Sequence, residues 1–167
     1  MGKLTQSRLR ELLNYNPDTG VFTWLQYRSQ LARAGSAAGR VNMTTGYVEI
    51  QIDGTRYKAH RLAWLYCHGV MPDKQIDHIN SNRTDNRIAN LRGATRSQNQ
   101  QNTGLTKANK SGRKGVYFRD GKWQAQAQID GKKYHLGRYK TIDEAGRAYE
   151  TFCRENYSCF YRHPATH

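Results

Sequence analysis

Long hydrophobic runs, paired cysteines and acidic residues are scarce in this sequence. The longest apolar stretch, from Leu62 to Cys67, has six residues, whereas a membrane-spanning helix needs about 20. The three cysteines form no C-x-x-C pair, which argues against a disulfide framework and a zinc knuckle. No apolar stretch follows the basic N-terminus, so a secretory signal is not indicated. We therefore expect an intracellular, cytoplasmic protein that does not bind a membrane.

Positive charge is what the sequence has in excess. Lys and Arg number 27 against 13 Asp and Glu, which gives a net charge of +14 over 167 residues. Such a surface suits a polyanion, and nucleic acid is the first partner to consider. The 3 Trp, 11 Tyr and 4 Phe supply apolar surface for one or two small cores. No leucine heptad is present, so we expect a monomer.

The first 70 residues predict a mixed α and β region. Leucines at helical spacing predict a helix that stops at the turn-forming residues 16–20. A short strand over 21–24 and a loop over 28–46 follow. Alternating residues on either side of Asp53-Gly54 predict a hairpin over 47–52 and 55–59. A buried helix over 60–68 then ends at Gly69.

Residues 71–102 are polar and rich in Asn, Asp and Arg, which is too much hydrogen-bonding capacity to bury without a reason. Within them, Asp77 precedes His78, so that a hard oxygen ligand stands beside a side chain that titrates near neutral pH. Thr95 and Gln98 form a capping-box pattern that starts a short helix and places Asn99 one turn in. Asp77 and Asn99 are therefore candidates to share one cation.

These residues resemble the HNH endonuclease family, whose ββα-metal motif carries a His on the first strand, an Asn on the second and a metal ligand on the helix. The match is Asp77-His78, Asn90 and Asn99. The resemblance implies that His78 is the general base that activates water and that Asn90 braces the loop and orients the imidazole. It also implies that Asp77 and Asn99 bind a single Mg²⁺ or Mn²⁺.

The third position of the motif departs from many family members, which have His where this chain has Asn99. The change favours a hard, oxygen-coordinated ion over zinc, as in the phage and intron homing enzymes with Asn at this place. The resemblance extends upstream through Ala59–Trp64 and Asn14–Gly20, so that it covers most of residues 4–102. His60 precedes a buried helix, and a structural hydrogen bond is expected for it rather than catalysis. Four arginines near the motif are predicted to contact phosphates: Arg83, Arg87, Arg92 and Arg96.

The last part of the chain predicts a sheet with one helix. Strand-like runs cover 115–119, 122–129 and 132–137, with Asp-Gly turns between them. A helix with Thr141 as N-cap and Glu144 as its capping-box partner follows, and it packs on one face of the sheet. Residues 103–140 hold ten Lys or Arg and two Asp, so most of the excess charge lies here.

The opposite face of this sheet is predicted to contact DNA. The predicted contacts are Lys114, Tyr117, Arg119, Lys122, Gln124, Gln126, Gln128, Lys133, His135 and Arg138. Gln suits adenine, Arg suits guanine, and the lysines suit phosphates. Residues 111 to about 160 resemble the AP2/ERF domain, through Gly115–Arg119, Gly121–Ala125, Leu136–Tyr139 and Asp143–Tyr149. That resemblance implies that a three-stranded sheet binds in the major groove of double-stranded DNA. Alternatively, the alternating Gln124, Gln126 and Gln128 form only a solvated face of the sheet.

The sequence thus predicts an α+β chain with an HNH nuclease domain over 1–102, whose ββα-metal core spans about 71–102. A linker over 103–110 and an AP2/ERF-like DNA-binding domain over 111–167 follow. The predicted function is site-specific, metal-dependent DNA cleavage of phage or intron homing type. A non-catalytic DNA-binding regulator on a decayed nuclease scaffold is the alternative. RNA binding is less favoured, because no RNP-like aromatic pair is present.

Overall fold

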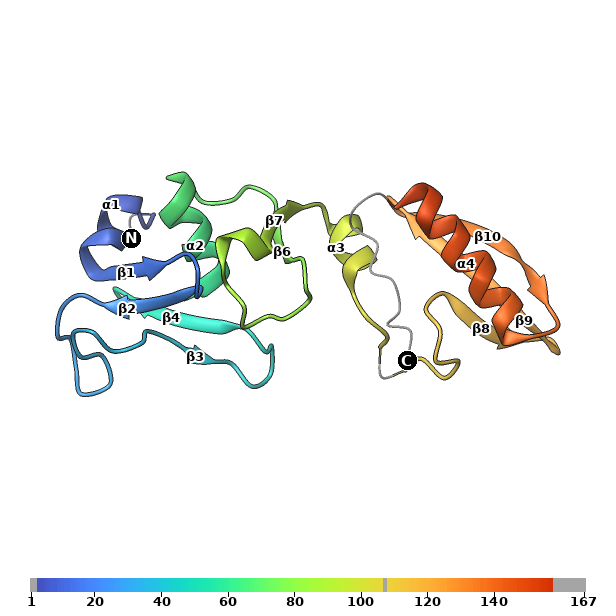
Figure 1. Cartoon of the computed structure of the whole chain (residues 1–167), viewed down its shortest axis with the longest axis horizontal. Coiled ribbons are helices and arrows are strands. Elements are labelled where there is room, and N and C mark those ends of the chain that lie inside the picture. The colour runs from blue at the N-terminus through green and yellow to red at the C-terminus, as the bar shows by residue number, and fades with distance from the viewer. Residues whose placement is uncertain (1–2, 107, 158–167) are drawn as a thin grey trace. The chain divides into compact units, whose positions relative to one another are not determined.

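A computed structural model describes residues 3–106 and 108–157 (Figure 1). The chain divides into two compact units, residues 1–94 and 95–167. The first unit contains α1 (Gln6–Leu12), β1 (Leu13–Asn16), β2 (Val21–Trp24), β3 (Arg40–Val41), β4 (Val48–Ile52), β5 (Thr55–Lys58), α2 (Ala59–His68), β6 (Gln75–His78), the short 3-10 helix η1 (Ile88–Asn90) and β7 (Leu91–Ala94). The second contains α3 (Arg96–Asn102), β8 (Val116–Arg119), β9 (Lys122–Ile129), β10 (Lys132–Tyr139) and α4 (Ile142–Asn156).

Three small antiparallel sheets make up the first unit: the hairpin β1–β2, the sheet β3–β4–β5 and the hairpin β6–β7 (Figure 1). The predicted hairpin about Asp53-Gly54 is confirmed, and both turn residues have positive φ. Leu9, Phe22, Ile50, Leu62 and Ile76 come from different elements and are buried in one core. The core therefore joins all three sheets to α1 and α2 and fixes where β6 lies.

The first helix is shorter than its leucine pattern predicts. It ends at Leu12, and Leu13–Asn16 pairs as β1 with β2, opposite residues 21–24. Leu13 and Tyr15 alternate with exposed Asn14 and Asn16, so the strand buries one face. Leu13 would be buried whether it continued the helix or began a strand. Its pairing with β2 makes it part of a strand. The long loop over 28–46 also contributes a short edge strand, β3.

The second unit is a three-stranded antiparallel sheet, in the order β10-β9-β8, with α4 packed on one face (Figure 1). The predicted strands, the helix and its capping box at Thr141 and Glu144 are confirmed. Ala125, Ala127, Ala145 and Tyr149 form the centre of its small core. Gly115 has positive φ and lies directly against the Tyr149 ring, where an added Cβ would collide. This close approach requires glycine.

Helix α3 belongs to the second unit, whereas the predicted nuclease domain includes it. Its capping box at Thr95 and Gln98 forms as predicted. The Lys114 ammonium donates to the backbone oxygens of Gln100, Gln101 and Thr103 at 3.0, 2.8 and 2.6 Å. Ser97 Oγ accepts from the Asp130 amide at the tip of the β9–β10 hairpin. These bonds attach α3 to the C-terminal sheet domain.

Candidate active site and candidate nucleic-acid interface

The hairpin β6–β7 carries the predicted Asp-His pair. Asp77 is opposite Arg92 in the register, and His78 is opposite Leu91. All four residues of the two pairs are held by strand geometry, but successive residues of a strand point to opposite faces. Asp77 and His78 therefore meet different partners, although they are neighbours in the sequence.

Asp77 is buried, and its carboxylate forms a cross-strand ion pair with Arg92. Arg92 Nε and Nη2 each lie 2.9 Å from Asp77 Oδ2. A buried charge needs such a partner, and the guanidinium fixes how the carboxylate is oriented. The sequence predicts a phosphate contact for Arg92, whereas in the structure its guanidinium is paired with the Asp77 carboxylate.

His78 is almost fully buried, with 4% of its surface exposed. Its Nε2 lies 3.3 Å from Asn86 Oδ1. Burial lowers the pKa of His78, and the hydrogen bond to Asn86 opposes this in part. The imidazole is consequently neutral at neutral pH, which is the form that accepts a proton.

An aromatic cluster packs around the His78 ring. The His60 ring is edge-on to it at 5.0 Å between centroids, and the Tyr47 ring lies at 5.9 Å. Lys58 and Arg83 both place their cations over Tyr47, at 4.5 and 5.0 Å from its centroid. Arg83 also donates to the Thr45 carbonyl. Two cations are thus held beside the ring that contacts His78.

The sequence predicts a structural hydrogen bond for His60, and in the structure its Nδ1 does not make one. This atom is buried and meets no hydrogen-bond partner within the described part of the chain. Burial, followed by the nearby His78 and Lys58 charges, lowers the pKa of His60 to about 3. The ring therefore serves as a neutral packing element beside His78.

The loop between β6 and β7 is braced by Asn90. Asn90 Oδ1 accepts from the Asn80 amide, and its Nδ2 donates to Asn80 Oδ1 and to the Asp85 carbonyl. Asp85 in turn pairs with Arg87 at 2.6 Å, which lowers the pKa of Asp85 to about 2. Arg87, another predicted phosphate contact, is therefore paired within the loop.

Asn86 was missed by the sequence reasoning, although it contacts the imidazole. Its amide Nδ2 donates to the Thr84 carbonyl, and the Tyr15 hydroxyl donates to the Asn86 backbone oxygen at 2.7 Å. An added Cβ at Gly20 would collide with the Asn86 and Arg87 backbone. The hairpin β1–β2 therefore supports this loop. The Asn-rich composition was the only signal, and it does not single out one Asn.

The last motif residue, Asn99, and the predicted phosphate contact Arg96 lie on α3, in the second unit. Asn99 is half-buried there, and Arg96 is exposed at the first helical position. Their predicted roles as metal ligand and phosphate contact stay predictions.

The candidate metal donors are the side-chain oxygens of Asp77 and Asn99. Among residues 3–106 and 108–157, no three His, Cys, Asp or Glu side chains are arranged to hold a metal ion. Asp77 and the Asn side chains offer carboxylate and amide oxygens, which suit Mg²⁺ or Mn²⁺. The donor chemistry therefore fits a hard divalent ion, with the Arg92 cation as a competitor at Asp77.

A family model described as HNH endonuclease matches residues 57–101. The match shows that this segment is similar to the HNH endonuclease family. It starts in β5, runs through α2, β6, η1 and β7, and ends in α3, so it includes all four predicted motif residues. No curated protein and no solved structure matches the chain. Outside the matched segment, the AP2/ERF resemblance rests on the sequence, and the hairpin β1–β2 lies upstream of the match.

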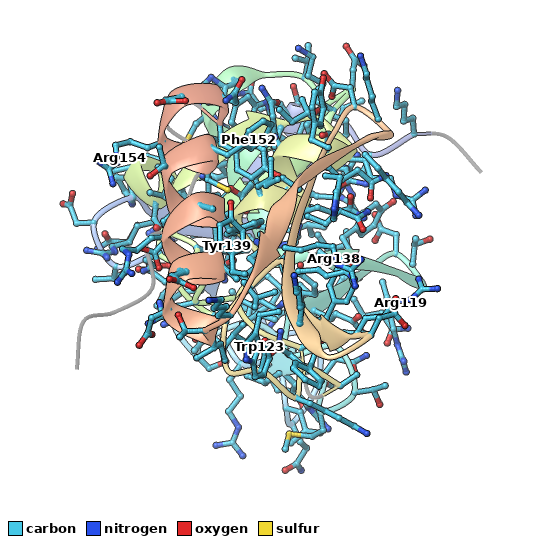
Figure 2. All side chains as sticks on the ribbon, turned by 90° about the vertical axis from the view of Figure 1, so that its right-hand side faces the viewer. Arg119, Trp123, Arg138, Tyr139, Phe152 and Arg154 are labelled. Atoms are coloured by element: carbon cyan, nitrogen blue, oxygen red, sulfur yellow. The ribbon has the colours of Figure 1, made fainter. Side chains whose placement is uncertain are left out.

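The sheet of the second unit presents the predicted residues on one face. The register places Tyr117, Gln124 and Arg138 in one row, and Gln126 with His135 and Gln128 with Lys133 in the next rows. Figure 2 shows Arg119 and Arg138 on the side of the sheet away from α4, while Tyr139 and Phe152 lie between sheet and helix. The predicted two-faced arrangement of this sheet is thus present.

The polar face is partly held by its own hydrogen bonds. The Tyr117 hydroxyl donates to Gln126 Oε1, and Arg138 Nη2 donates to the Asp120 carbonyl. Gln124 is buried, with 8% of its surface exposed. The most accessible side chains of the face are Arg119, Lys122, Gln128, Lys133, His135 and Arg138.

Lys114 has a different surrounding from the one that a phosphate contact needs. An ammonium has three donors, and the three carbonyls at the end of α3 match them. Burial lowers the pKa of Lys114. In the structure this cation caps α3 at its negative end, and the predicted DNA contact of Lys114 stays a prediction.

Proposed function

We propose that this protein is a metal-dependent DNA endonuclease of phage or intron homing type that cuts at a specific site. The match of an HNH endonuclease model to residues 57–101 carries the proposal. The polar network around His78 supports it, because a buried neutral imidazole held by neighbours is suited to take a proton from water.

In this mechanism His78 is the general base. Asp77, with Asn99 on the family resemblance, would hold one Mg²⁺ or Mn²⁺. When bound, the ion supplies positive charge for the phosphate oxygens and the leaving group. Asn90 braces the loop between β6 and β7. The cations of Arg83 and Lys58, which stack on the Tyr47 ring, supply positive charge for the DNA phosphates near His78.

The sheet β8–β9–β10 is proposed to read DNA through the face away from α4. Its accessible Arg, Lys, Gln and His side chains offer donors and acceptors suited to base edges and phosphates. The AP2/ERF resemblance points to the major groove. Because the chain has one motif set, one molecule should cut one strand.

A plasmid-cleavage assay tests this function. Supercoiled DNA that carries the recognition site, found by selection from a random library, is incubated with Mg²⁺, Mn²⁺ or EDTA. We expect open-circular DNA before linear DNA, and no cleavage with EDTA. Linear product formed at once, whatever the enzyme concentration, would exclude the one-strand proposal. Cleavage that EDTA does not affect would exclude metal dependence.

The second candidate function is a DNA-binding regulator that does not cleave. The Arg92–Asp77 ion pair favours it, because it places a cation on the proposed metal ligand. In this case the protein would still bind the selected DNA sequence in preference to other DNA. The plasmid would not be nicked with Mg²⁺, Mn²⁺ or EDTA. Arg92→Gln separates the candidates further: released from the cation, Asp77 should bind Mn²⁺ more tightly in a nuclease.

A further inference from the structure

The hydrogen bonds of Asn86 determine which of its amide atoms faces His78. The Thr84 carbonyl can only accept, so the Asn86 atom directed at it must be the donor Nδ2, at 3.2 Å. Oδ1 then faces the imidazole, at 3.3 Å from Nε2. An amide oxygen can only accept, so Nε2 must carry the hydrogen.

The position of Asn86 is itself fixed from two sides. Asn86 is 2% exposed, and the buried Tyr15 hydroxyl donates to its backbone oxygen at 2.7 Å. Burial raises the pKa of Tyr15 far above its usual range, so this hydroxyl keeps its proton as a donor. The support comes from β1, outside the matched segment 57–101.

We propose that Asn86 is a positioning residue that holds the His78 imidazole in the tautomer with hydrogen on Nε2 and so assigns Nδ1 as its basic nitrogen. The inference rests on the proposed function for its catalytic meaning. It does not rest on it for the tautomer, which exists without DNA or metal. A general base works through one nitrogen in one direction, so a second tautomer or a rotated ring lowers the turnover rate.

The direct test is the ¹⁵N NMR spectrum of the His78 ring in the full-length protein, recorded near pH 8 without metal. His78→Gln identifies the signals. We expect one protonated nitrogen, Nε2, and one unprotonated nitrogen, Nδ1. A spectrum with hydrogen on Nδ1 would overturn the proposal with no variant needed, whether or not the protein cleaves DNA.

Two substitutions of similar size separate the oxygen acceptor from packing. Asn86→Leu removes the acceptor and should move the ring signals toward a mixture of tautomers, with kcat about ten-fold lower and KM unchanged. Asn86→Asp keeps an oxygen acceptor and should keep the Nε2–H tautomer. Equal spectra and equal kcat for Asn86→Leu and the wild type would overturn the proposal.

Tyr15→Phe provides a milder variant if Asn86→Leu does not fold. It keeps the buried ring and removes only the hydroxyl that donates to Asn86, so we expect a smaller change in the same direction. The outcomes also separate this inference from the proposed function. A wild type that never cleaves while His78 shows Nε2–H contradicts only the function, and active enzyme with the other tautomer contradicts only the inference.

Discussion

The two polar regions of the molecule differ in how firmly their side chains are held. Around β6, Asp77, His78, Asn86 and Asn90 are all at most 7% exposed, and each is fixed by a neighbour. On the sheet β8–β9–β10, most of the polar residues are open to solvent. Proton transfer needs a fixed geometry, whereas a surface that reads a polymer can order its side chains on binding. The difference fits the two roles proposed above, which are proton transfer at β6 and DNA recognition on the sheet β8–β9–β10.

A histidine in each region gives the sharpest test of this separation. His78→Ala should lower the cleavage rate at least about 100-fold and leave DNA affinity nearly unchanged, because it removes the base. His135→Ala, on the exposed sheet face, should leave the rate at saturating DNA unchanged and weaken binding. Single-turnover rates and fluorescence anisotropy measure the two effects. Full cleavage by His78→Ala would refute the assignment of the base.

An asparagine and a glutamine test how firmly the two regions are fixed. Asn90→Ala removes one bond that Asn90 accepts and two that it donates, and should cost about 1–3 kcal/mol of unfolding free energy. Gln128→Ala removes an exposed side chain and should change it by less than about 0.5 kcal/mol. Chemical denaturation measures both. Equal losses would show that the loop between β6 and β7 is no more fixed than the sheet face.

The regular elements could be predicted because local signals and burial agree. The Asp53-Gly54 hairpin, the Gly69 stop and both capping boxes follow from residues close in sequence. Strand β1 was missed because Leu13 fits a helix face and a strand face equally well, and only β2, beyond the turn, decides.

The sequence predicted which residues form the motif of the candidate site, but not which residues they contact. Asp77, His78 and Asn90 were found as a motif, but their partners depend on contacts that the sequence does not encode locally. In the sequence Asn86 is one Asn among several. It is distinguished by the hydrogen bond from the hydroxyl of Tyr15, which lies 71 residues upstream. The charge of Lys114 predicts a phosphate contact, whereas its three carbonyl acceptors cannot be predicted from residues close in sequence.

Two arginines on the sheet sharpen the recognition half of the comparison. Arg119→Ala with Arg138→Ala should weaken DNA binding several-fold and lower the slope of log K against log salt by about 0.9 for each phosphate that is no longer neutralised. Arg154→Ala is the matched control, because Figure 2 places Arg154 on α4, away from this face. Titrations at several salt concentrations measure the slopes. A control as defective as the double variant would mean that charge alone, and not this face, binds DNA.

The smallest expected effect is a pH dependence of stability in the first unit. His60 has a folded-state pKa of about 3 because it is buried, whereas an unfolded histidine takes a proton below about 6.5. Between these values the unfolded state binds more protons, so stability falls as pH falls through this window. From pH 7 to pH 6 the loss is about 0.7 kcal/mol for one such histidine. Hydrogen exchange of the α2 amides measures the opening of this unit alone, and His60→Phe should reduce the pH effect. A variant with the full wild-type pH dependence would show that His60 is not kept neutral by burial, and that the region around His78 is more open to water than the comparison requires.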